Sequence, residues 1–273
     1  MQLENMYWYF SSALTNEICD KIIEIGEQGI ASALESGESI DATTFSGHDK
    51  ATQEKVNPDA VSMADLTVSE LAEKGISMKE VIDRDVHVSW LYDRWINDLV
   101  LGYVMEANYR AGWNFDIDHT EPMQFGRYGI NQFHGWHPDS SHKPYGAYWN
   151  VKSPPIGEPF QEVIIDGEVE YEPIIGLEAA QRAMMWHRDP NAAGKIRKLS
   201  VTVNLSDSDD YTGGNLRFDC GPHAEEKRFV TCEEIRPRGS IIVFPSHFFH
   251  QVTPITHGTR RSLVMWSLGP PFK

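Results

Sequence analysis

Residues 236–270 read RPRGSIIVFPSHFFHQVTPITHGTRRSLVMWSLGP, and this stretch decides the fold. It contains two short runs rich in β-branched and apolar residues, Ser240–Phe244 and Arg261–Trp266. Turn-forming residues precede both runs, Pro237-Arg238-Gly239 before the first and a segment containing Pro254 before the second. Short runs of this kind, bounded by turn residues, are typical of strands in a β-sandwich or barrel.

The same pattern of short apolar runs bounded by turn residues begins near Trp113 and extends through the C-terminal half of the chain. Further candidate strands are Met123–Tyr128, Gln132–Asp139, Lys198–Leu205 and Asn215–Phe218. Many short strands joined by turns most simply form a double-sheet jelly roll, also called a double-stranded β-helix.

Helical patterns dominate the region before these strands. Thr15 is a suitable N-cap for a helix that has Ile18 and Ile22 on one side and ends near Gly26 and Gly29. A short strand is expected at Val86 and Val88, and Ser89 is expected to cap a second amphipathic helix. The apolar positions of that helix are Leu91, Trp95, Leu99 and Tyr103.

We therefore expect an α+β fold with a double-stranded β-helix core and N-terminal supporting helices. Residues 1–110 would form the helical support packed on the core. Residues 111–273 would form the jelly-roll domain, with an insertion at about 140–197.

The insertion contains signals of its own. Val163–Ile165 and Val169–Tyr171 flank Asp166-Gly167 and predict a β-hairpin, and Leu177–Arg188 is helical in pattern. So long a segment beside a functional motif is often a lid or a substrate platform. The alternative is a solvated insertion with no role.

Composition excludes several classes of function. The chain of 273 residues has a formal net charge of −16, which repels phosphate backbones and anionic membrane surfaces, so neither nucleic acid nor membrane is expected as a partner. Its 3 cysteines lack CxxC spacing, which favours a reducing compartment. No apolar run approaches the roughly 20 residues that span a bilayer, and the N-terminus does not look like a signal peptide. These features predict a cytoplasmic protein.

The motif that carries chemistry is His137-Pro138-Asp139. Side chains alternate along a strand, so His137 and Asp139 would share a face whereas His134 would face the opposite side. His142 falls after the expected end of the strand. A 2-His-1-carboxylate set with a second histidine suits Fe(II) with open coordination positions.

Two histidines compete for the second position, His247 and His250. The turn signal around Pro245 leaves His247 in the turn, and His250 begins the next extended segment, so we favour His250.

Arg260 adds a fork suited to a carboxylate, and it shares a strand face with Ser262, Val264 and Trp266. A surface ion pair would explain the neighbouring Arg261, and it is the simpler alternative for Arg260 as well. Because burying an arginine without an anion is costly, its coincidence with the metal motif favours a functional role.

Taken as a set, these residues resemble the Fe(II)- and 2-oxoglutarate-dependent dioxygenases, in particular the prolyl 4-hydroxylase-like branch. The resemblance rests on QFGRYGINQFHGWHPDS (124–140), on RKLSVTVNLS and YTGGNLRF within 197–218, and on residues 236–270. The early YWYFSSALTNEICDKIIEIGE is also similar, more loosely.

The resemblance implies His137, Asp139 and His250 as iron ligands. It implies Arg260 as the partner of the distal carboxylate of 2-oxoglutarate, with Tyr128 and Ser262 in support. Prolyl hydroxylases of the collagen type usually have lysine where this chain has Arg260.

The implied reaction is hydroxylation of a prolyl residue in a peptide or protein, coupled to conversion of 2-oxoglutarate and O2 into succinate and CO2. Ascorbate is the implied reductant. Candidate substrate contacts are Tyr148, Trp149 and Trp266, of which the first two could equally pack the insertion onto the core.

Three alternatives remain open. The substrate could be a free amino acid or another small molecule. The chain could be a cupin-like metal protein that does not use 2-oxoglutarate, or a catalytically silent binding module. The oligomeric state is not predicted.

Overall fold

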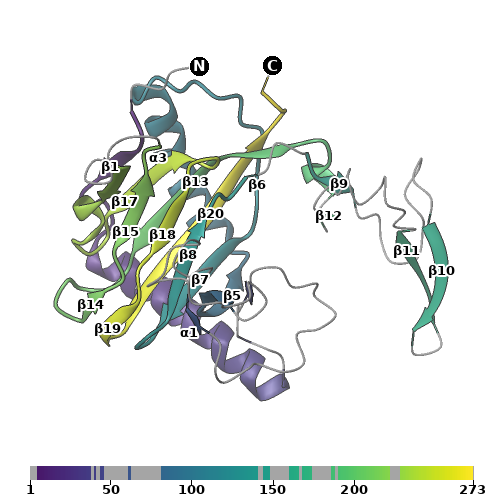
Figure 1. Cartoon of the computed structure of the whole chain (residues 1–273), viewed down its shortest axis with the longest axis horizontal. Coiled ribbons are helices and arrows are strands. Elements are labelled where there is room, and N and C mark those ends of the chain that lie inside the picture. The colour runs from purple at the N-terminus through teal and green to yellow at the C-terminus, as the bar shows by residue number, and fades with distance from the viewer. Residues whose placement is uncertain are drawn as a thin grey trace.

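Two seven-stranded sheets contain most of the strands. The computed structural model describes residues 5–37, 40, 44–45, 61–62, 81–140, 144–147, 160–165, 168–173, 186–187, 190–221 and 228–272. Figure 1 shows the strands of both sheets, with helix α1 and helix α3 beside them. The expected α+β fold with a double-stranded β-helix core is confirmed.

The first sheet is antiparallel throughout. Its order is β1 (Trp8–Phe10), β17 (Ile241–Pro245), β13 (Ile196–Asn204), β20 (Arg260–Gly269), β7 (Met123–Tyr128) and β5 (His87–Leu91), and β6 (His119–Thr120) also pairs with β20. Strands far apart in sequence are neighbours here, as expected of a jelly roll.

The second sheet carries the metal motif. Its order is β16 (Phe229–Thr231), β15 (Leu216–Asp219), β18 (His250–Val252), β8 (Phe133–His137), β4 (Val81–Asp85) and β2 (Thr44–Phe45), and β3 (Val61–Ser62) pairs with β4. Three smaller pairs are β10 (Phe160–Ile165) with β11 (Glu168–Pro173), β9 (Gly146–Ala147) with β12 (Trp186–His187), and β14 (Tyr211–Gly213) with β19 (Ile255–Gly258).

The main core lies between the first sheet and two helices, α1 (Asn16–Ser36) and α3 (Arg94–Arg110). Strand β20 shows how alternation divides the two faces. Leu263 and Met265 are buried in the helix-covered core, whereas Ser262 and Trp266 line a pocket on the other side. One strand thus supplies both the core and the site.

Helix α1 begins as expected but ends later. The Thr15 side chain accepts a hydrogen bond from the Ile18 amide, and the helix continues past Gly26 and Gly29 to Ser36. The expected end at the two glycines is wrong, because they serve packing. A Cβ on Gly26 would lie 2.3 Å from the Phe125 ring, so only glycine lets α1 approach the sheet this closely.

The role expected for Ser89 is also wrong. It lies inside β5, and its hydroxyl donates to the Gly26 carbonyl of α1 at 2.8 Å. Helix α3 begins at Arg94, after Asp93. Tertiary pairing of β5 with β7 extends the strand over residues whose local pattern fits a helix start.

Within the insertion, β10 and β11 form the expected hairpin. The helix expected over Leu177–Arg188 lies outside the described residues except for Trp186–His187, which form β12. The division at residues 110 and 111 remains a prediction, although β1, β4 and β5 of the first segment belong to the two sheets.

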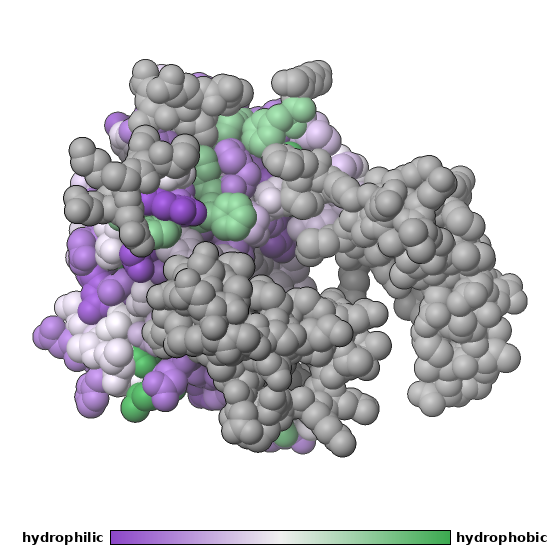
Figure 2. All heavy atoms as spheres, viewed as in Figure 1, coloured by the Kyte–Doolittle hydropathy of each residue, from purple (hydrophilic) through white to green (hydrophobic). Residues whose placement is uncertain are grey.

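The surface seen in Figure 2 is mostly hydrophilic among its coloured residues, with apolar side chains in small groups. Among the described residues, no helix has the length and apolar character needed to cross a bilayer.

The approach of α1 to β7 gives a test of the packing. Replacement of Gly26 by alanine forces a methyl group against the buried Phe125 ring. We expect this overpacking to lower the free energy of unfolding by about 1–3 kcal/mol, measured by urea denaturation. Gly102→Ala in α3 is the matched control, because nothing lies within 4 Å of its added Cβ. The control should raise the free energy of unfolding by about 0.5–1 kcal/mol, and equal effects of the two substitutions would contradict the packing account.

Candidate metal centre

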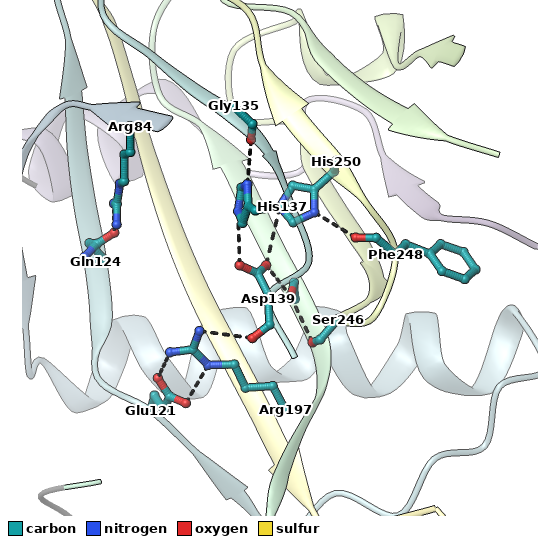
Figure 3. A network of polar contacts seen from close by, with 11 residues as sticks. Arg84, Glu121, Gln124, Gly135, His137, Asp139, Arg197, Ser246, Phe248 and His250 are labelled. Carbon is teal, nitrogen blue, oxygen red and sulfur yellow. Dashed lines mark hydrogen bonds and ion pairs between the residues drawn. The ribbon is translucent and has the colours of Figure 1, made fainter. Parts of the chain in front are cut away.

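His137 and His250 are direct partners across two antiparallel strands. β18 pairs with β8 in the register that sets His250 opposite His137, and their ring centroids are 4.2 Å apart. Phe244 packs against the His250 ring from within the core. The two imidazoles therefore lie side by side on the inner face of the second sheet (Figure 3).

Asp139 joins them from a turn, not from the strand. β8 ends at His137, since Pro138 has no amide hydrogen to continue a sheet. The Asp139 amide instead donates to the Ser246 carbonyl at 2.9 Å. This corrects the expected strand over Gln132–Asp139, yet the carboxylate still reaches both histidines. Its oxygens lie 3.4 Å from Nε2 of His137 and 3.5 Å from Nε2 of His250.

Backbone carbonyls fix which nitrogen of each imidazole faces the centre. Nδ1 of His137 lies 2.8 Å from the Gly135 carbonyl, and Nδ1 of His250 lies 3.0 Å from the Phe248 carbonyl. A carbonyl only accepts, so each Nδ1 carries the proton and each Nε2 has a free lone pair. Such outer contacts commonly orient histidines that bind metals.

This donor set fits a divalent metal. The ligand atoms of His137, Asp139 and His250 all lie within 4.8 Å of one another. Burial and the neighbouring His137 lower the pKa of His250 to about 4. Burial alone would raise the pKa of Asp139, but His250 and His137 offset this and hold it well below its usual range. Two imidazoles and one carboxylate are the set typical of non-haem Fe(II).

His134 lies on the same side as His137, contrary to expectation. The pairing of β18 with β8 shifts between two points, His250 opposite His137 and Val252 opposite His134. β8 therefore has one more residue than β18 in this interval, which is a β-bulge. Because of the extra residue, the side chain of His134 lies on the same side of β8 as that of His137. The centroids of the two stacked rings are 3.5 Å apart.

A polar network holds Asp139 from the first sheet. The Ser200 hydroxyl donates to Oδ2 of Asp139 at 2.7 Å, and Nη1 of Arg197 lies 3.3 Å from the Asp139 carbonyl. Arg197 is itself paired with the buried Glu121 through two contacts of 2.7 and 2.5 Å. Figure 3 shows Arg197 between Glu121 and Asp139. Nothing in the local sequence distinguishes Ser200 or Glu121, because both act through tertiary contacts.

Arg260 points into the same pocket and is only 1% exposed. Its Nη1 donates to the Ser262 hydroxyl at 3.3 Å, and the Tyr128 ring lies 5.5 Å from the guanidinium. Nε of Arg260 is buried without a hydrogen-bond partner. Among the described residues, no carboxylate pairs with this arginine, so the surface ion pair considered from the sequence does not account for it.

The pocket has a volume of about 500 Å³, including its opening to solvent. Seven of the residues singled out from the sequence line it: Tyr128, His137, Asp139, His250, Arg260, Ser262 and Trp266. Tyr148 and Trp149 lie outside the described residues. Trp266 is 7% exposed and stacks under Arg197 at 4.0 Å. Arg84 and Gln124 also line the pocket, and sequence reasoning missed both.

Comparison with known proteins agrees with this geometry. Residues 177–268 match the family model described as the 2OG-Fe(II) oxygenase superfamily. This stretch is therefore similar to that superfamily, over about a third of the chain. The matched stretch includes His250, Arg260 and Ser262, and the fold adds His137 and Asp139 from outside it.

Curated relatives include a PKHD-type hydroxylase of Synechococcus sp. (strain CC9605), 34% identical over 94 residues, and one of Synechococcus sp. (strain CC9902), 40% identical over 82 residues. The matches cover 34% and 30% of this chain and 40% and 34% of those relatives' own lengths. A solved viral collagen prolyl hydroxylase from Paramecium Bursaria Chlorella virus-1 aligns over 97% of both chains with a TM-score of 0.48 and 12% identity.

The network around Asp139 can be tested through metal affinity. Ser200→Ala removes the hydroxyl that holds Oδ2 of Asp139. We expect the affinity for Co(II), measured anaerobically by calorimetry, to fall about 10-fold or more, as is common when a partner of a metal ligand is removed. Ser208→Ala, at an exposed position, is the control and should leave the affinity unchanged. An unchanged affinity in Ser200→Ala would show that the hydroxyl does not position the carboxylate.

Proposed function

We propose that this chain is an Fe(II)- and 2-oxoglutarate-dependent dioxygenase that hydroxylates its substrate. One observation carries the proposal: Arg260, a buried arginine with no acidic partner among the described residues, lines the same pocket as the His137, Asp139 and His250 cluster. A generic metal site does not need a buried guanidinium, whereas 2-oxoglutarate has a distal carboxylate that would pair with it.

Each of the pocket residues would have a separate role. His137, Asp139 and His250 would hold Fe(II), and Arg260 would bind the distal carboxylate of 2-oxoglutarate, with Ser262 fixing the guanidinium. The hydroxyl of Tyr128, whose ring lies 5.5 Å from the Arg260 guanidinium, would donate to the same carboxylate. The bound iron supplies the oxidising chemistry: substrate, O2 and 2-oxoglutarate give hydroxylated substrate, succinate and CO2.

We propose a prolyl residue in a peptide or protein as the substrate. The resemblance of residues 124–140, 197–218 and 236–270 to the prolyl 4-hydroxylase-like branch supports this. Trp266 at the pocket is a candidate contact, together with Tyr148 and Trp149. Ascorbate as reductant, a cytoplasmic location and a jelly-roll domain over 111–273 belong to the same proposal.

Arg260 separates this function from a cupin-like metal protein without 2-oxoglutarate. Arg260→Gln should raise the KM for 2-oxoglutarate about 10- to 100-fold, as expected for loss of a charge-assisted hydrogen bond. Formation of succinate from labelled 2-oxoglutarate measures this effect. Arg261→Gln is the matched control, since Arg261 pairs with Glu27 away from the pocket. Equal behaviour of the two variants would favour the cupin-like alternative.

The metal ligands give a second test. His137→Ala should abolish succinate formation and weaken Fe(II) binding, because one of three ligands is lost. Wild-type protein that binds neither Fe(II) nor 2-oxoglutarate would instead support a silent binding module. A separate measurement tests the prolyl substrate. If the active enzyme hydroxylates a prolyl residue, mass spectrometry of proline-containing peptides after turnover should show a gain of one oxygen.

A further inference from the structure

Arg84 is a second arginine in the pocket, and the function proposed above gives it no task. It lies on β4 at the position directly opposite His134 of β8, whose ring stacks on the candidate ligand His137. Its Nη2 donates to Oε1 of Gln124 on β7 at 2.5 Å, so the side chain spans from the second sheet to the first (Figure 3).

No carboxylate forms a direct ion pair with this guanidinium among the described residues. Gln124 is a neutral partner, and Nε of Arg84 is buried without any hydrogen-bond partner. Burial lowers the pKa of Arg84, and Tyr128 and Asp139 offset this only in part. Arg197 differs from Arg84, because the Glu121 carboxylate forms an ion pair with the Arg197 guanidinium in the same region. Arg84 is half-buried, and a buried guanidinium nitrogen without a partner costs stability unless a ligand supplies one.

The charges in the pocket point to the sign of that ligand. Fe(II), Arg84 and Arg260 would bring four positive charges, whereas Asp139 and 2-oxoglutarate would bring three negative ones. One positive charge therefore remains once metal and co-substrate are bound. The distal carboxylate of 2-oxoglutarate is already paired with Arg260 in this arrangement, so Arg84 is available to the substrate.

Resting on the proposed function, we propose that Arg84 binds a carboxylate of the substrate that is hydroxylated, with Gln124 holding the guanidinium in place. Arg84 lines the same pocket as the candidate metal ligands, so a carboxylate bound to it would lie near the carbon that is hydroxylated. Two sources share this chemistry: the α-carboxylate of a free amino acid, or an acidic residue next to the target residue of a peptide.

The test compares matched probes that differ only in this charge. The full chain is loaded anaerobically with Fe(II) and 2-oxoglutarate, and probe binding is followed by the change in visible absorption of the metal chelate. One arm uses the common L-amino acids and their primary amides. The other uses acetyl-Pro-Asp-amide with acetyl-Pro-Asn-amide, and acetyl-Asp-Pro-amide with acetyl-Asn-Pro-amide. We expect at least one carboxylate to bind at least about 10-fold more tightly than its amide, and the arm in which this occurs identifies the source.

Arg84→Gln should reduce that preference to about 1, and Arg84→Lys should retain part of it because it keeps the charge without the fork. Arg94→Gln is the control for net charge, since Arg94 is exposed on α3, and it should keep the full preference.

Three results would overturn the role of Arg84: no carboxylate preference in the wild type, an undiminished preference in Arg84→Gln, or an equal loss of 2-oxoglutarate affinity in that variant. The wild-type comparison needs no substitution, so a variant that fails to fold does not remove the test. Absence of any Fe(II)–2-oxoglutarate chelate in the wild type would overturn the proposed function as well, which distinguishes the two failures.

Discussion

The site depends on the register in which β18 pairs with β8. This register sets His250 opposite His137, and the turn after β8 then carries Asp139 back to both imidazoles. Because side chains alternate, a slip of one residue would send one histidine to the other face of the sheet. The amides of Asp139 and Ser140 both donate to the Ser246 carbonyl, which ties the end of β8 to the segment that leads into β18.

The first sheet contributes pocket residues that are not metal ligands. Through alternation along β20, Arg260, Ser262 and Trp266 face the pocket while Leu263 and Met265 anchor the strand in the helix-covered core. The pocket therefore combines a metal-binding face on the second sheet with the buried Arg260 on the first, in a chain whose formal net charge is −16. Arg84 and Arg260 have no acidic partner among the described residues, and we propose that through them this acidic protein binds carboxylates.

Much of this arrangement could be predicted from the sequence because it follows from local periodicity. The strand pattern of Met123–Tyr128 matches β7, and the face shared by Arg260, Ser262 and Trp266 follows from period two. The failures have tertiary causes. The bulge in β8 reverses the side expected for His134, and the packing of Gly26 under Phe125 lets α1 continue where glycine suggested an end. Arg84 and Ser200 were missed because only the fold brings them to the metal motif.

The most direct measurement is a crystal structure of the chain grown without oxygen in the presence of Fe(II) and 2-oxoglutarate. The account predicts one metal ion bound by Nε2 of His137, Nε2 of His250 and a carboxylate oxygen of Asp139, with 2-oxoglutarate chelating it and its distal carboxylate on Arg260. Metal bound through other residues, or 2-oxoglutarate absent from Arg260, would contradict it.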